Sequence, residues 1–253
     1  MRALIYLITI SAFLTSLIHR DSKAHAGNNM RDGNQTPQSL ELKNNRGSLD
    51  YWLFLPKGYE ASDHTKPWPL MIFLHGHGER GDNLDKVKLW GPPKRAEKDP
   101  SFPFVLVSPQ LPEKYHSWQV SQLQQLVEHS IESLNVDRDR IYLTGLSMGG
   151  RGSWALAAKT PERFAAVIPI CGGGKPKTAA RLVDVPIWAF HGDADGVVPV
   201  EKTKEMVKSI KDSGGEKVKM TIYHGVKHNS WSQTYANPEI YQWLLKQQRK
   251  PRN

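Results

Sequence analysis

Residues 140–150, with the sequence RIYLTGLSMGG, decide the fold. They contain an apolar run typical of a buried strand and then Gly-x-Ser-x-Gly centred on Ser147, after which a helical pattern begins. The turn is so tight that side chains two positions on either side of the serine would clash, which explains Gly145 and Gly149. We predict that Ser147 is a nucleophile, against the alternative of an incidental serine in a glycine-rich turn.

Strand and helix patterns alternate on both sides of this turn. Seven runs are predicted as strands, at 49–55, 70–74, 104–107, 140–144, 165–170, 187–190 and 219–223, and four segments as helices, at 120–134, 148–159, 201–213 and 238–248. The last six strands are mostly continuous apolar runs, which is typical of strands covered on both faces. We therefore predict an α/β fold, with a mainly parallel twisted sheet and helices on both faces. The 16 residues between 170 and 187 are too few for a lid domain.

A serine hydroxyl is a weak nucleophile until a neighbouring base takes its proton. After a serine in this kind of turn, the acid and then the histidine of a triad follow along the chain. The loop after the sixth predicted strand offers Asp193 and Asp195, and the loop after the seventh offers His224 and His228. We prefer Asp195 because it lies deeper in its loop, whereas Asp193 is expected to brace the turn. We prefer His228 because His224 directly ends the strand.

Acyl transfer also needs N–H donors for the oxyanion of the tetrahedral intermediate. The first donor is expected directly after the nucleophile, at Met148, and the second in the loop after the strand at 70–74. That loop, HGHGERG at 75–81, is rich in glycine, and we assign the second donor to the N–H of His77.

The same loop contains other polar side chains. No carboxylate or thiol ligand clearly accompanies its two histidines, so we expect them to shape the loop and predict no metal site. Glu79 and Arg80 are expected to brace the loop through ion pairs, with binding of a substrate carboxylate as the alternative for Arg80.

Three other side chains lie near predicted strand ends. Trp118 and Trp231 are candidates for the wall of an acyl or aromatic substrate pocket, and packing in the core or at the rim is the alternative for both. Cys171, the only cysteine, ends an apolar strand and is interpreted as an inert buried thiol.

The N-terminus is typical of a secretory signal. A short basic start and an apolar run at 3–18 precede Ala-His-Ala at 24–26, and an uncleaved membrane anchor is the alternative. We predict a signal peptide at 1–26, a flexible leader at 27–47, the folded domain at 48–248 and a basic tail at 249–253. The protein is expected to be secreted or to lie in the periplasm or cell envelope, without stable membrane insertion after cleavage.

Composition limits the partners. Hydrophobic residues make up 39% of the 253 residues and charged ones 23%, which excludes wholesale disorder. The net charge is +9, but the basic residues are dispersed and do not form a stripe interleaved with aromatics. We therefore expect no nucleic-acid partner, and only weak attraction to anionic surfaces such as acidic polysaccharide.

Several stretches together carry a family resemblance: LHGHGERG at 74–81, SPQ at 108–110 with Trp118, the turn at 145–150, the loop at 191–199 and HNSW at 228–231. They resemble the α/β-hydrolase superfamily, and within it the exported esterases of the predicted-peptidase, phospholipase/carboxylesterase-like and dienelactone-hydrolase-like group. The resemblance extends from about residue 48 to 248. It implies an α/β-hydrolase fold, the triad Ser147, Asp195 and His228, and an oxyanion hole at His77 and Met148.

The predicted function is a serine hydrolase that cleaves carboxylic esters through an acyl-enzyme on Ser147. The substrate is expected to be a small-molecule or polysaccharide-linked ester, and the chemistry needs no cofactor. A serine peptidase of the prolyl-oligopeptidase-like clan would use the same three residues. A non-catalytic envelope-binding protein is the second alternative, and the intact order of serine, aspartate and histidine argues against it.

Overall fold

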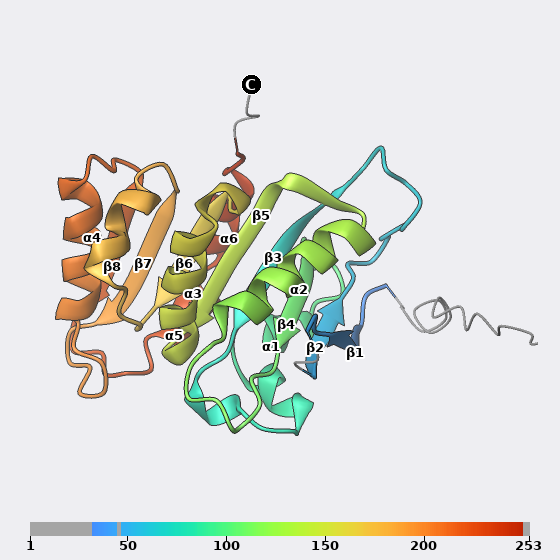
Figure 1. Cartoon of the computed structure of the whole chain (residues 1–253), viewed down its shortest axis with the longest axis horizontal. Helices are drawn as coiled ribbons and strands as arrows, with labels where there is room; N and C mark the ends of the chain where they lie inside the picture. Colours follow the sequence, from blue (N-terminus) through green and yellow to red (C-terminus); the bar gives the residue numbers. More distant parts are fainter. Residues whose placement is uncertain (1–31, 45–46, 250–253) are drawn as a thin grey trace, which may run out of the picture. The chain divides into compact units, whose positions relative to one another are not determined.

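The computed structural model describes residues 32–44 and 47–249 of the chain, and Figure 1 shows its ribbon. The strands of the described part are β1 Gln35–Glu41, β2 Ser48–Phe54, β3 Trp68–Leu74, β4 Val105–Pro109, β5 Val136–Leu146, β6 Ala166–Ile170, β7 Ile187–Gly192 and β8 Val218–Tyr223. The α-helices are α1 Gly91–Ala96, α2 Val120–Ser133, α3 Met148–Lys159, α4 Glu201–Asp212, α5 Trp231–Ala236 and α6 Pro238–Leu245. Short 3-10 helices lie at η1 His77–Glu79, η2 Leu84–Leu89, η3 Pro161–Arg163 and η4 Pro176–Leu182.

All eight strands form one sheet in the order β1-β2-β4-β3-β5-β6-β7-β8. β2 pairs antiparallel with β1 and β4, and every other neighbouring pair is parallel. The parallel strands therefore end at the same edge, which is where ligands bind in open α/β sheets. The predicted mainly parallel sheet is confirmed.

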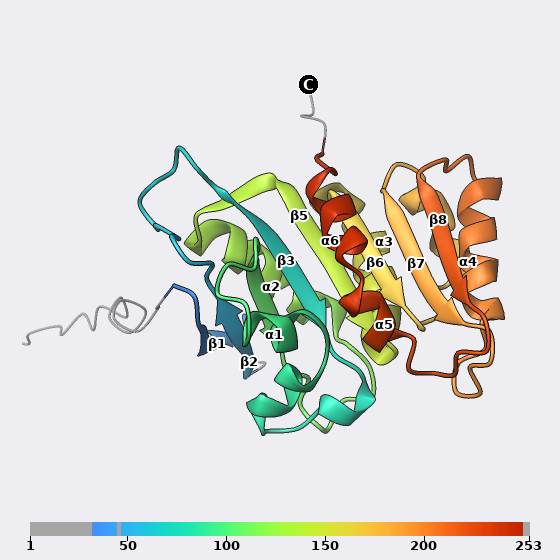
Figure 2. The ribbon, with the colours of Figure 1, turned by 180° about the vertical axis from the view of Figure 1, so that it is seen from behind.

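Helices cover both faces of this sheet, as predicted. α2, α3 and α4 lie on the face seen in Figure 1, and α1, α5 and α6 lie on the face seen in Figure 2. β3 shows why both faces are apolar. Its residues Leu70, Ile72 and Leu74 pack into the core beneath α2, α3 and α4, whereas Met71 and Phe73 pack with α5 and α6. The continuous apolar run predicted as a strand is thus buried on both sides.

The predicted boundary of the folded domain is wrong. Residues 35–41 lie within the expected flexible leader at 27–47, yet they form β1 and pair with β2 along its whole length. Their side chains are at most half-buried, because β1 is an edge strand, so the apolar signal that marks the inner strands is missing.

Other predictions concern the ends of the chain and the connections. The predicted signal peptide at 1–26 and residues 250–253 of the tail lie outside the described residues. No helix in the described part is both long and apolar enough to cross a membrane. The connection from β6 to β7 contains only η4, in agreement with the absence of a lid domain predicted there. α1 and α5 were not predicted.

Candidate active site

Ser147 lies at the turn between β5 and α3 in a strained conformation, with φ 53° and ψ −114°. Its N–H donates to the Ile170 carbonyl of β6 (2.9 Å), which holds the turn against the sheet. A Cβ added at Gly145 would lie 2.5 Å from the carbonyl oxygen of Gly149, and one at Gly149 would overlap the carbonyl of Leu74. The structure therefore confirms the steric reason for both glycines.

The structure brings Ser147, Asp195 and His228 together from the ends of β5, β7 and β8. His228 Nε2 lies 2.9 Å from Ser147 Oγ, and His228 Nδ1 lies 2.7 Å from Asp195 Oδ2. An ionised carboxylate only accepts hydrogen bonds, so His228 Nδ1 carries the ring proton and donates a hydrogen bond to Asp195. Nε2 of the neutral ring is then free to accept the hydrogen bond of the serine hydroxyl.

Asp195 is held in place by backbone and side-chain donors. Its Oδ1 accepts the N–H groups of Val197 (2.8 Å) and Val198 (2.9 Å), and its side chain is fully buried. Burial alone would raise the pKa of Asp195, but the hydrogen bonds from His228, Val198 and Val197 outweigh it and lower the pKa. The carboxylate therefore stays ionised at neutral pH.

A second histidine, which was not predicted as a site residue, also contacts Asp195. His191 Nε2 lies 3.0 Å from Asp195 Oδ2 and 2.9 Å from the Val198 carbonyl, and its Nδ1 lies 2.7 Å from Thr203 Oγ1. Because both neighbours of Nε2 are acceptors, Nε2 carries a proton and donates to them, and Nδ1 forms a hydrogen bond with the Thr203 hydroxyl. His191 is fully buried and lies behind the carboxylate.

The two residues weighed against Asp195 and His228 form a separate pair. Asp193 Oδ2 lies 2.8 Å from His224 Nδ1, and its Oδ1 accepts the N–H of Gly225 (2.7 Å). Asp193 thus braces the turn after β8, which is the role expected for it.

Two backbone N–H groups lie where oxyanion donors are expected. Met148 begins α3 and His77 begins η1, and within the described chain neither N–H has an acceptor. The loop that contains His77 reaches the nucleophile turn, since a Cβ at Gly76 would lie 2.7 Å from Leu146 Cδ1.

His75 anchors this loop from within the core. It is 1% exposed, its Nε2 accepts the N–H of Leu111 (3.0 Å), and its Nδ1 donates to the Gly76 carbonyl (2.6 Å). Burial lowers the pKa of His75 to about 4, so the ring is neutral and both nitrogens serve the loop.

Arg80 braces the loop, but the predicted ion pair is wrong. Its guanidinium donates to the carbonyls of His77 (3.0 Å), Glu113 (3.0 Å) and Tyr115 (2.8 Å) and to His77 Nε2 (2.7 Å). A guanidinium presents a fixed fork of donors, which suits several carbonyls at once. Arg80 is thus committed to the loop and not to a carboxylate.

The two tryptophans differ. Trp118 is 6% exposed, and its indole N–H donates to the His75 carbonyl (3.2 Å), so the structure favours packing for this residue. The Trp231 ring contacts the His228 ring (5.4 Å between centroids) and the Trp90 ring (6.1 Å).

Trp231 and Trp90 also line a cavity of about 320 Å³ between α1 and α5. The indole N–H of Trp231 is buried without an acceptor among the described residues. Trp90 was not identified from the sequence, because nothing in its local pattern distinguishes it from a packing residue.

Cys171 follows β6 and is fully buried, with φ 40°. Burial raises its pKa to about 12, which leaves the thiol protonated and unreactive at neutral pH. This agrees with its interpretation as an inert thiol.

Known proteins share this arrangement of sheet and sequence. A sequence model of the phospholipase/carboxylesterase family matches residues 102–238, more than half of the chain. The chain belongs to this family. The predicted family, the α/β-hydrolase fold and, at the level of the family, the enzyme class of carboxylic ester hydrolases are thereby confirmed.

Several proteins that this member of the phospholipase/carboxylesterase family resembles are named as esterases. A solved structure of a thermostable esterase shares 32% identity at a TM-score of 0.73, and the match covers 86% of this chain and 64% of that one. A probable feruloyl esterase C of Aspergillus terreus is 25% identical over 82% of this chain and 74% of its own length. The bifunctional acetylxylan esterase/xylanase XynS20E of Neocallimastix patriciarum is 24% identical over 61% of this chain, but the match spans only 23% of that protein.

Proposed function

We propose that this chain hydrolyses carboxylic esters through an acyl-enzyme on Ser147, with Asp195 and His228 as the other members of a triad. The observation that carries the proposal is the continuous chain of hydrogen bonds from Asp195 through His228 to Ser147, at 2.7 and 2.9 Å. Groups this close can pass a proton without rearrangement.

The roles follow from the tautomer. His228 Nε2 takes the Ser147 proton as Oγ bonds to the acyl carbon, and the resulting imidazolium is stabilised by the ionised Asp195. When the tetrahedral intermediate collapses, the bond to the alcohol oxygen breaks and His228 gives its proton to that oxygen. Water then attacks the acyl-enzyme by the same route, which releases the acid and restores the serine.

The oxyanion would be held by the N–H groups of His77 and Met148. Both are free of internal acceptors in the described chain, and Arg80 and His75 fix the loop that contains the first. Losing one such donor costs about 100–1,000-fold in rate in well-studied hydrolases.

The substrate is proposed to be an ester of an aromatic or small acyl group, presented on a small molecule or a polysaccharide. The cavity lined by Trp90 and Trp231 lies next to the candidate site, because the Trp231 ring contacts the His228 ring. Its aromatic walls suit an aromatic ring. Relatives named feruloyl esterase and acetylxylan esterase support this class of substrate.

Labelling with a fluorophosphonate probe tests the nucleophile. The wild type and Ser117→Ala, which changes an exposed serine, are expected to take up one label, and Ser147→Ala none. We expect kcat/KM of Ser147→Ala for p-nitrophenyl acetate to fall by about 10⁴–10⁶-fold, because the loss of one triad residue costs about as much activity as the loss of all three. Persistent labelling of Ser147→Ala would contradict the proposal. Comparison of p-nitrophenyl esters with peptide amides separates an esterase from the peptidase alternative.

The export of the protein is also proposed, on the sequence of residues 1–26 alone. Mass spectrometry of the product outside the producing cells is expected to find a chain that begins at Gly27. A product that keeps Met1 would favour the anchor alternative.

A further inference from the structure

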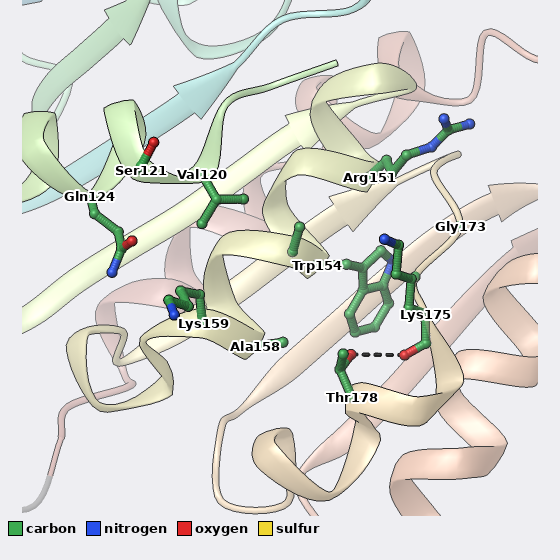
Figure 3. A pocket seen from close by; sticks show the side chains of 12 residues that line it. Val120, Ser121, Gln124, Arg151, Trp154, Ala158, Lys159, Gly173, Lys175 and Thr178 are labelled. Atoms are coloured by element: carbon green, nitrogen blue, oxygen red, sulfur yellow. Dashed lines mark hydrogen bonds between the residues drawn. The ribbon is translucent and has the colours of Figure 1, made fainter. Parts of the chain in front are cut away.

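A second cavity lies on the outer side of α3, next to the nucleophile. It has a volume of about 350 Å³ and lies between the start of α2, α3 and the loop that runs from β6 into η4 (Figure 3). It begins one helical turn from the nucleophile, because Arg151 lines it and the Arg151 N–H donates to the Ser147 carbonyl (3.0 Å). We call it the α3 groove.

The α3 groove is positively charged. Arg151, Lys159 and Lys175 line it, all three side chains are exposed, and none forms an ion pair with a carboxylate of the described chain. No Asp or Glu lines the groove in the described structure. Exposed cations elsewhere on this surface, such as Lys208, do pair with acids. The α3 groove therefore presents three uncompensated charges to a ligand.

The spacing of these charges indicates an extended ligand. Arg151 and Lys159 are eight residues apart in one helix, so their backbones are separated by about 12 Å along its axis. Figure 3 shows Arg151, Lys159 and Lys175 at separate points around the groove. A single phosphate or carboxylate cannot contact all of them, whereas a chain with several anionic groups can.

The lining between the charges favours a sugar chain over a nucleic acid. Ala155, Ala158 and Val120 provide small apolar surfaces, and Gln124 and Thr178 provide groups that can bond to hydroxyls. The aromatic residue of the groove, Trp154, is 1% exposed, and its indole N–H donates to the Gly172 carbonyl. It offers no open face on which a base could stack.

We propose that the α3 groove binds a carboxylate-bearing stretch of polysaccharide, a polyuronate segment of the same molecule that presents its ester to Ser147. This assignment rests on the proposed ester hydrolysis and adds the chemical class of the carrier. The groove would hold the anionic backbone of the polymer one helical turn from the nucleophile. Esters on acidic polysaccharide would then be favoured over the same esters on neutral polymer.

Direct binding tests the groove without any turnover. The probe is de-esterified polygalacturonate, titrated calorimetrically into the folded protein at low ionic strength, with dextran as the neutral polymer. The groove variant is Arg151→Gln/Lys159→Gln/Lys175→Gln. The matched control is Arg138→Gln/Lys57→Gln/Lys211→Gln, which removes one arginine and two lysines that are also exposed and unpaired in the described chain. Thermal unfolding checks that both variants are folded.

Wild type and control are expected to bind polygalacturonate alike, with binding that weakens as salt is added, and neither is expected to bind dextran. The groove variant is expected to bind about tenfold more weakly, as three exposed charge pairs would give. No binding by the wild type, or equal weakening in both variants, would overturn the proposal, and so would binding to anionic vesicles in place of polygalacturonate. Fluorophosphonate labelling of the same samples reports on the proposed hydrolase separately.

Discussion

Asp195 shares one carboxylate oxygen between two imidazoles, those of His228 at 2.7 Å and His191 at 3.0 Å. The substitution His191→Phe removes the hydrogen bond from His191 Nε2 to Asp195, while an aromatic ring still fills the space. We expect kcat for p-nitrophenyl acetate to fall about 10–100-fold, as is usual when a supporting hydrogen bond behind a functional group is lost, with KM little changed.

Substitutions at Thr203 provide the controls for this prediction. Thr203→Ser keeps the hydroxyl that bonds to His191 Nδ1, and Thr203→Val removes it with little change of shape. We expect Thr203→Ser to keep the wild-type kcat. We expect Thr203→Val to lower kcat, but by less than His191→Phe does. An unaltered kcat in His191→Phe would show that Asp195 is held in place without His191.

His75 predicts a loss of stability in acid. Its pKa is lowered to about 4 in the folded protein from 6.5, so the unfolded chain binds this proton more tightly. The free energy of unfolding should therefore be unaffected by this group above pH 6.5 and should fall as the pH drops toward 4. The shift corresponds to about 3 kcal/mol. Denaturant unfolding at pH 7 and pH 4 should show a smaller drop in His75→Gln than in the wild type.

An exposed histidine serves as the comparison for His75. His116→Gln alters a surface side chain and should keep the wild-type dependence of stability on pH. If His75→Gln and the wild type lose the same free energy between pH 7 and pH 4, the burial of a neutral imidazole does not explain the acid sensitivity.

The sequence indicated the candidate site well where each residue lies in a turn or loop that follows a strand. Ser147 stands in a turn with its own glycine signature, and Asp195 and His228 lie in loops that the topology must bring to one edge. His191 could not be recognised in this way, because it lies inside β7 and its role depends on Thr203 of α4, a contact that only tertiary packing creates. A histidine at the end of a wholly apolar run was the one available signal.

At the scale of elements, the turn between β5 and α3 depends on the absence of a side chain at Gly149. A Cβ there would overlap the carbonyl groups of Leu74 and His75 at the end of β3. We expect Gly149→Ala to lower the free energy of unfolding by about 2–4 kcal/mol, because rigid backbone must move to make room.

The comparison for Gly149 is Gly196→Ala. A Cβ at Gly196 meets nothing within 4 Å, and the change should alter stability by less than about 1 kcal/mol. Thermal and denaturant unfolding of the two variants measures the difference. Equal stability of both would mean that the turn can widen at no cost.

The inner elements were predictable because burial leaves a pattern in the sequence. Six apolar runs predicted six of the strands to within a few residues, and α3 has the predicted bounds of 148–159. α1 and α5 were not predicted because each has only six residues, which is too few to show a helical period. β1 reads QTPQSLE and lies at an edge, where nothing forces its side chains to be apolar.

At the scale of the whole molecule, β1 shows that the folded unit includes residues before the predicted start at residue 48. It pairs with β2 over Gln35–Glu41, and Leu42 just beyond it is 6% exposed. A chain that begins at residue 48 should therefore unfold at a lower temperature than one that begins at residue 27, and its uncovered β2 edge should promote aggregation. Differential scanning calorimetry and light scattering measure both effects, and equal melting temperatures would show that β1 contributes nothing.

The base and the nucleophile lie in unequal surroundings. β5 is flanked on both sides within the sheet, but β8, which leads into the loop of His228, has β7 as its single neighbour in the described chain. If warming unfolds β8 locally, His228 would move away from the site, whereas Ser147 would keep its position at the end of the inner strand β5. The enzyme would then lose activity at a temperature below its melting temperature, because the edge strand β8 unfolds before the centre of the sheet.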